Sequence, residues 1–354
     1  MKIAIATDAW HPQVNGVVRS ISATVECLRT MGHDVRIIDP SAFRTVPCPT
    51  YPEIRLALDA RRKVAKLLDG FGPEDRIHIS SEGPIGWAAR HWCIRNGHQF
   101  TTAFHTRFPD YVSIRTGIPA EWVWKVMRRF HGRATRTFTA TPTLAAELQA
   151  HGLKQTHHWP RGVDLDQFNR DGPPHPAMAS LPRPIMLNVG RVAVEKNIEA
   201  FLDCDAPGSK VVVGDGPALA ALKDRYSRVH FLGPMHGAEL ASAYRAADVF
   251  VFPSRTDTFG LVNIEALACG VPVAAYPVPG PADILGQNER GLHGGKARIG
   301  ALDEYLGRAI MRAQTADRKA AAKEAAHYSW DECTRLFLAG LAPPAEVEDL
   351  ARAA

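Results

Sequence analysis

A loop and a helix start in the second half of the chain combine a glycine with two carboxylates. Within residues 253–273, Asp257 lies in the loop, Gly260 directly precedes a predicted helix, and Glu265 lies inside that helix. The first N–H groups of a helix carry partial positive charge, so a helix start beside a small residue suits a diphosphate. The carboxylates could accept hydrogen bonds from sugar hydroxyls. They could equally be charges that stabilise the helix start, and the residues alone leave both interpretations open.

Two cations follow the first predicted strand of the same half. Arg191 offers a planar fork for phosphate oxygens, and Lys196 offers a compact point charge. Negative charge builds on a diphosphate leaving group as its bond to the sugar breaks, so such cations would stabilise it. A solvated surface loop would also carry an Arg and a Lys, which is the alternative.

The first half carries weaker candidates. The loop at residues 11–18 contains Asn15 and Gly16 just before a predicted helix, so the backbone there could approach an anion closely. His105 ends another predicted strand. An ordinary strand-to-helix turn and a structural histidine are the alternatives.

Alternating strands and helices must position these groups. Apolar runs predict buried strands, and helical spacing of apolar residues over 85–95 and 120–132 predicts helices between them. This alternation is typical of α/β proteins with doubly wound parallel sheets, which bind ligands beyond the carboxyl ends of their strands. The predicted strands are 2–7, 35–38, 77–79, 100–104, 135–140, 185–189, 210–213, 229–232, 249–252 and 271–275.

The length of 354 residues and a Pro-rich stretch at 171–184 favour two domains. We expect an N-terminal domain over 1–170 and a C-terminal domain over 171–328. A helix at about 329–342 is expected to pack back on the first domain. Two such Rossmann-like domains would face each other across a cleft.

The composition limits the compartment and the partners. A net charge of +5 suits anionic substrates or an anionic membrane surface, and nucleic acid is not an expected partner. The six cysteines form no C-x-x-C pair, which favours a reducing compartment. The first apolar run ends at Asp8, too early for a signal peptide, and no stretch approaches the roughly 20 apolar residues of a membrane span. We therefore expect a cytoplasmic protein.

The second half resembles the large retaining glycosyltransferase family 4, whose fold is GT-B. Members carry a G-R-x(4)-K element, a G-x-G-P turn, and an E-x(7)-E element before A-x-x-C/S-G-x-P-V. The chain matches these with Gly190-Arg191 and Lys196, with Gly214-Asp215-Gly216-Pro217, and with Asp257 and Glu265; residues 244–254 also resemble the family closely.

The resemblance makes 1–170 the acceptor-side domain and 171–328 the donor-binding domain, and it implies a role for each matching residue. Arg191 and Lys196 would bind the donor diphosphate, Glu265 the ribose, and Asp257 the transferred sugar. One departure from the pattern is Asp257, which replaces the first glutamate and is one methylene shorter. The other implied donor-site positions are Gly214 and the backbone at Phe259, Gly260 and Leu261.

In the first half, the resemblance places Asn15 and Gly16 beside the leaving phosphate and His105 near the anomeric centre. The implied reaction is front-face substitution, in which a phosphate oxygen takes the proton of the acceptor hydroxyl. No metal and no cofactor are expected, because the D-x-D triplets at 164–166 and 203–205 lack the strand context of a metal motif. The nucleotide diphosphate sugar, expected to be UDP-linked, is a co-substrate.

Residues 115–133 combine tryptophans, aliphatic side chains and basic residues in one predicted helix, as interfacial helices do. A core-facing stripe with a solvated basic face is the alternative. Glycolipid-forming members of the family, including those that glycosylate diacylglycerol, use such a segment near the acceptor. We therefore expect transfer of a hexose or hexuronate to diacylglycerol, peripherally, on the inner face of the cytoplasmic membrane.

Other acceptors and other classes stay open. A soluble or polyprenyl-linked sugar is the alternative acceptor. A nucleotide-sugar epimerase would convert a UDP-sugar without any acceptor. A dinucleotide-dependent oxidoreductase would need G-x-G-x-x-G after the first strand, where the chain instead reads Thr7-Asp8-Ala9-Trp10-His11-Pro12. A non-catalytic nucleotide-sugar-binding subunit is disfavoured by the charges at Arg191, Lys196 and Glu265.

Overall fold

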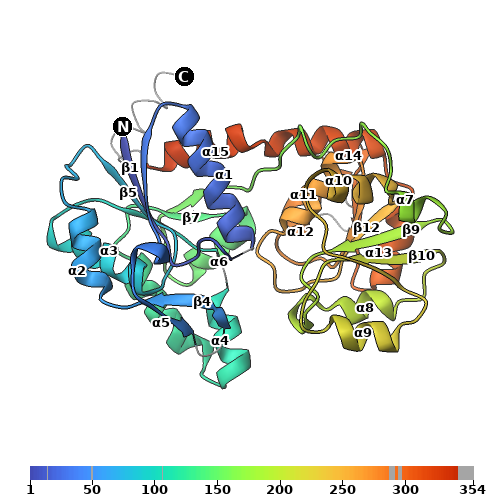
Figure 1. Cartoon of the computed structure of the whole chain (residues 1–354), viewed down its shortest axis with the longest axis horizontal. Coiled ribbons are helices and arrows are strands. Elements are labelled where there is room, and N and C mark those ends of the chain that lie inside the picture. Colours follow the sequence, from blue (N-terminus) through green and yellow to red (C-terminus); the bar gives the residue numbers. More distant parts are fainter. Residues whose placement is uncertain (14, 49–50, 106, 287–291, 294–296, 342–354) are drawn as a thin grey trace. The chain divides into compact units, whose positions relative to one another are not determined.

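The computed structural model describes residues 1–13, 15–48, 51–105, 107–286, 292–293 and 297–341. The chain forms two compact units. The first comprises Met1–Pro160 together with the C-terminal segment that begins at Trp330, and the second comprises Arg161–Ser329. Each is an α/β unit built on a parallel sheet of six strands (Figure 1).

The sheet of the first unit has the order β2-β1-β5-β6-β7-β8, with all neighbours parallel. The order reverses between β1 and β5, so their carboxyl ends form the topological switch point where such sheets bind ligands. The strands are β1 (Lys2–Ala6), β2 (Asp34–Ile38), β5 (Arg76–Ile79), β6 (Thr101–Ala103), β7 (Thr137–Thr139) and β8 (Thr156–His158).

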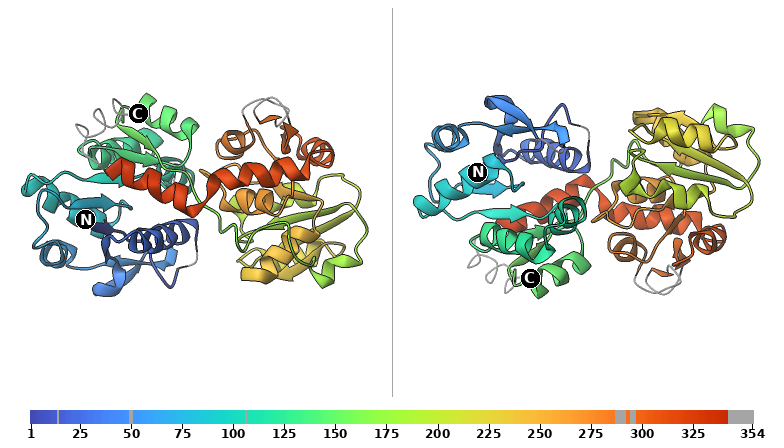
Figure 2. Two further views of the ribbon diagram at one scale, coloured as in Figure 1. Left: turned by 90° about the horizontal axis from the view of Figure 1, so that it is seen from above. Right: turned by 90° about the horizontal axis from the view of Figure 1, so that it is seen from below.

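Helices cover both faces of this sheet. On one face, α1 (Gly16–Thr30) and α15 (Trp330–Leu341) lie side by side and bury Ile21 and Phe337 against the strands (Figure 2). On the other face, α2 (Ala60–Leu67), α3 (Pro84–Arg95) and α5 (Ala120–His131) bury Val64, Ile85 and Phe130. Covering both faces explains why the central strand β1 reads as a short apolar run, in which Ile3 to Ala6 are buried.

Smaller elements complete the first unit. A hairpin of β3 (Thr45–Cys48) and β4 (Tyr51–Ala57) forms a separate antiparallel pair. The short helix η1 (Pro40–Ala42) precedes it, α4 (Phe108–Thr116) contacts α5, and α6 (Pro142–Ala150) contributes Leu144 and Leu148 to a cluster with Phe104 and Trp124.

The sheet of the second unit has the order β11-β10-β9-β12-β13-β16. Its switch point therefore lies between β9 and β12, as in dinucleotide-binding sheets. The strands are β9 (Ile185–Val189), β10 (Ser209–Val213), β11 (His230–Gly233), β12 (Val249–Phe252), β13 (Val273–Ala275) and β16 (Gly300–Leu302); β14 (Leu292–His293) and β15 (Ala297–Arg298) form a separate pair.

On one face of this sheet, apolar side chains of α8 (Ile198–Leu202), α9 (Leu219–Arg225) and α13 (Leu306–Ala313) share a core with Met186, Val212 and Val251. A second group of helices surrounds the buried α11 (Leu261–Ala268), namely α10 (Gly237–Ala246), α12 (Pro281–Leu285) and α14 (Arg318–Ala325). The remaining short helices are α7 (Pro176–Ala179), η2 (Val194–Lys196) and η3 (Ala326–Tyr328).

Two doubly wound parallel-sheet domains, the predicted fold class, are confirmed. The boundary between the units differs from the expected residue 170. The chain enters the second unit at Arg161, where the N–H of Val163 donates to the carbonyl of Tyr328 at 2.7 Å. The Pro-rich stretch belongs to the second unit, because the N–H of His175 donates to the carbonyl of Ser242 at 3.0 Å. Its prolines mark loops around α7 rather than a link between the units.

Candidate functional site

Two loops meet at the switch point of the second unit. The loop after β9 carries Arg191 and Lys196, and the loop after β12 carries Asp257. Asn197, in the first of these loops, has a left-handed backbone with a φ of 53°. Its side-chain amide donates to the carbonyl of Pro253 at 3.1 Å. This bond joins the two loops, which are far apart in sequence, at the carboxyl edge of the sheet.

The cation and the carboxylate predicted for this site contact each other directly. Lys196 Nζ lies 2.6 Å from Asp257 Oδ1, and the two side chains keep 30% and 21% of their surface exposed. The other oxygen, Asp257 Oδ2, is buried and has no hydrogen-bond partner among the described residues. A buried acceptor without a partner is costly, so a hydroxyl donor placed there would be stabilising.

The start of α11 is formed by a tightly packed glycine. Gly260 has a φ of +83°, and a Cβ atom at this position would lie 2.6 Å from the side-chain nitrogen Nδ2 of Asn263 and 2.7 Å from the Phe252 ring. Only glycine fits such a turn. No side chain caps the helix start, and Phe259 is buried against Tyr328 with ring centroids 6.0 Å apart. The N–H groups of the first turn, including that of the half-buried Leu261, thus have no side-chain acceptor from the N-cap.

The second carboxylate of the motif, Glu265, is only 2% exposed. Its Oε2 atom accepts a hydrogen bond from the Tyr244 hydroxyl at 2.9 Å in the buried interior. Tyr244 therefore orients this carboxylate. Residue types and spacing did not identify Tyr244, which lies 21 positions away in sequence.

The remaining donor-site candidates differ in kind. The Arg191 side chain is exposed on its loop. Gly214 has a φ of +142°, and a Cβ there would lie 1.9 Å from the carbonyl oxygen of Gly190. This glycine lets the turn after β10 pack against the loop after β9, which is a structural reason for its presence.

His105 lies at the carboxyl edge of the first unit. Its Nε2 atom and the Ser80 hydroxyl are 2.9 Å apart, and its ring meets the edge of Trp159 at a centroid distance of 5.7 Å. The neighbouring Thr106 lies outside the described residues.

A buried carboxylate near His105 was not predicted as a site residue. Asp8, directly after the Thr7 that follows β1, accepts hydrogen bonds from the N–H groups of Ile85 and Gly86 and from the Ser81 hydroxyl, at 2.8 to 3.2 Å. Burial raises the pKa of Asp8, against the lowering effect of these bonds. Asp8 thus occupies the start of α3, and its role is to join that helix to β1.

Asn15 caps the start of α1. Its side-chain oxygen accepts from the N–H groups of Val17 and Val18, both at 3.0 Å. These two donors are therefore already used, and Gly16 is the first helical residue. Val14 in this loop lies outside the described residues.

The helix α5 presents two different faces. Trp124, Met127 and Phe130 are buried, and Trp124 stacks on His151 at 3.8 Å between ring centroids. The other face exposes aromatic, aliphatic and basic side chains. They are Trp122 (67% exposed), Val126 (47%), Lys125, Arg129 and, just beyond the helix, Arg133; Ile118 (43%) precedes it. The Arg115 side chain lies outside the described part of the chain.

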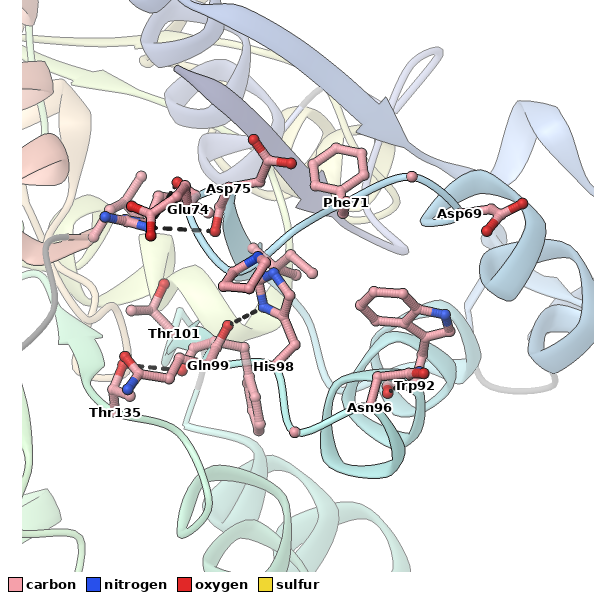
Figure 3. A pocket seen from close by; sticks show the side chains of 17 residues that line it. Asp69, Phe71, Glu74, Asp75, Trp92, Asn96, His98, Gln99, Thr101 and Thr135 are labelled. Atoms are coloured by element: carbon pink, nitrogen blue, oxygen red, sulfur yellow. Dashed lines mark hydrogen bonds between the residues drawn. The ribbon is translucent and has the colours of Figure 1, made fainter.

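A cavity of about 520 Å³ opens at the opposite edge of the first sheet, where β5 and β6 begin (Figure 3). Trp92 and His98 line it with ring centroids 5.7 Å apart, and the His98 ring bonds the carbonyl of Gly72 at 2.8 Å. None of the predicted site residues lines this cavity. Because ligands of such sheets bind at the carboxyl edge, this cavity is not the candidate site.

No helix within the described residues is long and apolar enough to span a membrane. Those residues also contain no group of three or more His, Cys, Asp or Glu side chains that could hold a metal ion. Metal independence itself stays a prediction.

Two family profiles match the chain. The profile described as Glycosyltransferase Family 4 matches residues 14–167, and the one described as Glycosyl transferases group 1 matches residues 179–327. The first of these profiles covers the strands of the first sheet except β1, and the second covers all six strands of the second sheet.

Several curated proteins are similar along most of their length. A GDP-mannose-dependent alpha-mannosyltransferase of Mycolicibacterium smegmatis is 33% identical over 82% of this chain and 84% of its own. The sulfoquinovosyl transferase SQD2 of Arabidopsis thaliana is 28% identical over 91% and 69%. An alpha-monoglucosyldiacylglycerol synthase of Streptococcus pneumoniae is 28% identical over 79% and 72%.

Solved structures share the fold. A sucrose-phosphate synthase from Thermosynechococcus elongatus superposes with a TM-score of 0.72 at 23% identity, covering all of both chains. The Anabaena protein Alr3699/HepE, solved in complex with UDP, superposes with a TM-score of 0.65 at 14% identity over 96% of this chain and 98% of its own.

Proposed function

Because this chain belongs to glycosyltransferase family 4, we propose that it transfers a hexose or hexuronate from a UDP-linked donor to diacylglycerol, with retention of configuration. That it is a glycosyltransferase using a nucleotide sugar follows from the family and its relatives.

The donor end of the reaction is assigned to the switch point of the second unit. Arg191 and Lys196 would neutralise the diphosphate, together with the uncapped start of α11. Asp257 would hold Lys196 with Oδ1 and accept a hydroxyl of the sugar with Oδ2. Glu265, oriented by Tyr244, would accept the ribose hydroxyls.

The chemistry then needs neither a metal nor a cofactor. The acceptor hydroxyl attacks the anomeric carbon on the side from which the diphosphate leaves. An oxygen of the leaving phosphate takes the acceptor proton, and the protein cations stabilise the negative charge that develops there. His105 positions the sugar or the acceptor in the first unit, where Asn15 and Gly16 would lie near the phosphate.

The exposed face of α5 is the observation that carries the lipid acceptor. Trp122 and Val126 expose 67% and 47% of their surface, and Lys125 and Arg129 are exposed among them. A helix with this combination lies in a membrane interface, where the apolar groups enter the headgroup boundary and the cations attract anionic lipids. The chain would thereby act peripherally on the inner face of the cytoplasmic membrane. A relative named alpha-monoglucosyldiacylglycerol synthase supports the same acceptor.

A matrix of donors and acceptors tests the proposal. UDP-glucose, UDP-galactose, UDP-glucuronate and GDP-mannose are each offered with diacylglycerol in anionic vesicles, with a soluble sugar, or with a polyprenyl-linked sugar. We expect a glycosyl-diacylglycerol from a UDP donor, identified by mass spectrometry, with the α-anomer retained in its NMR spectrum. Products from the soluble or polyprenyl-linked sugar alone would overturn the lipid acceptor. Loss of activity in EDTA would overturn metal independence.

GDP-mannose is the second candidate donor. Mycobacterial relatives named as GDP-mannose-dependent mannosyltransferases share 33% and 32% identity with this chain. Product formation with GDP-mannose and with none of the UDP-sugars would favour this donor over the proposed one.

A further inference from the structure

His105 is held by a buried hydroxyl on the neighbouring strand. Ser80 directly follows β5, and His105 lies two residues beyond β6, which pairs with β5. The Ser80 side chain is fully buried, and its Oγ atom lies 2.9 Å from His105 Nε2. A hydrogen bond at one ring nitrogen fixes the tautomer and the orientation of a histidine.

A second contact restrains the same ring from another direction. The Trp159 indole meets the His105 ring at 68° with centroids 5.7 Å apart. Trp159 is 1% exposed and packs against Phe337 of α15 at 5.0 Å. The C-terminal helix α15 therefore packs behind Trp159, the side chain that contacts the His105 ring.

We infer that Ser80 is a positioning residue for His105, through the hydrogen bond between its hydroxyl and Nε2. This inference rests on the proposed function, in which His105 positions the sugar or the acceptor. A misplacement of about 1 Å in such a group costs roughly 100-fold in rate. The simpler explanation is that Ser80 and His105 merely satisfy each other's hydrogen bonds in the fold. The two explanations predict different kinetics.

The test is a double-mutant cycle of Ser80→Ala and His105→Ala. We expect Ser80→Ala to lower kcat by about 10- to 100-fold, with KM for the donor changed by less than about threefold. In the His105→Ala background it should change kcat by less than about twofold, because Ser80 acts only through His105. Ser80→Cys replaces the hydroxyl by a somewhat larger thiol that forms a weaker hydrogen bond, and its kcat should be intermediate.

Ser209→Ala is the matched control. Ser209 is a buried serine of the second unit whose hydroxyl donates to the carbonyl of Pro182 at 2.8 Å. Its loss should lower thermal stability about as much as Ser80→Ala does and leave kcat unchanged. Equal losses of kcat from Ser80→Ala with and without His105, or from Ser209→Ala, would overturn the inference.

A readout that needs no substrate separates this inference from the proposed function. The C2–H resonance of His105, assigned by its loss in His105→Ala, is followed through a pH titration by NMR. We expect its midpoint to move in Ser80→Ala and to stay in Ser209→Ala. An unmoved midpoint overturns the positioning role. A moved midpoint without transfer to any acceptor supports the contact and overturns the proposed function alone.

Discussion

Replacing Lys196 by methionine tests the donor site most directly. The change removes the ammonium group that lies 2.6 Å from Asp257 Oδ1 and keeps a side chain of similar length. If Lys196 stabilises the charge on the departing diphosphate, kcat should fall by about 100- to 1000-fold, as when one preorganised donor is lost, which corresponds to about 2.7–4 kcal/mol.

The effect on folding should be much smaller. Lys196 keeps 30% and Asp257 21% of its side-chain surface exposed, so solvent screens the pair. Pairs in contact with solvent contribute about 0–1 kcal/mol, and the free energy of unfolding should change within that range. Transfer rates give kcat, calorimetry gives the binding of UDP and GDP, and urea unfolding gives the free energy of unfolding.

The pair of Arg183 and Asp248 provides the control. Its N–O distance is 2.5 Å, and it lies at the beginnings of β9 and β12, whereas Lys196 and Asp257 follow the ends of the same strands. Arg183→Met should therefore leave kcat and nucleotide binding unchanged. The reasoning fails if Lys196→Met keeps kcat within about twofold, or if both variants lose stability and activity in parallel.

Three further changes have defined outcomes. Gly260→Ala places a Cβ in a crowded position with a positive φ, so it should lower the free energy of unfolding in urea by about 1–3 kcal/mol and abolish UDP binding measured by calorimetry. Gly233→Ala is the control, because Gly233 has a φ of +78° but nothing within 4 Å of its Cβ position, and this variant should still bind UDP. The double variant Lys125→Glu, Arg129→Glu should weaken binding to anionic vesicles, measured by co-sedimentation, by about 1 kcal/mol or more per residue, and it should leave binding to neutral vesicles unchanged. Equal loss of binding to both vesicle types would contradict the electrostatic role. Burial lowers the pKa of His157 in the folded protein below its unfolded value of 6.5. Its stabilising contribution is therefore present above pH 6.5 and is lost as pH falls from there through the folded pKa. The melting temperature should drop between pH 7 and 5, and less so in His157→Gln.

Buried strands were readable from sequence because a parallel strand covered on both faces is a short apolar run. The strands missed lack that signature. β8 (Thr156–His158) is polar because it lies at the sheet edge, and β16 (Gly300–Leu302) contains small residues packed closely against β13. The hairpin of β3 and β4 was also not predicted, because its two antiparallel strands follow each other without a helix between them.

Candidate site residues were readable where the chemistry lies within one loop. Asp257, Gly260 and Glu265 fall within nine consecutive positions, so their spacing was visible. The partners of Glu265 and His105 were not identified, because each is contributed by another element. Tyr244 of α10 bonds Glu265 of α11 once the two helices pack together, and Ser80 bonds His105 once β5 and β6 have paired.

The two tryptophans of α5 show the limit of sequence alone. Composition and helical spacing determined that 120–132 is an amphipathic helix with aromatic and basic residues, and the fold class followed from similar patterns along the whole chain. Trp122 and Trp124 are about 200° apart around such a helix, so at most one of them can face the sheet. Tertiary packing determines which of the two tryptophans is buried. Trp124 stacks between His151 and Phe104, and Trp122 is left exposed, because the side that touches α6 and β6 depends on neighbours distant in sequence.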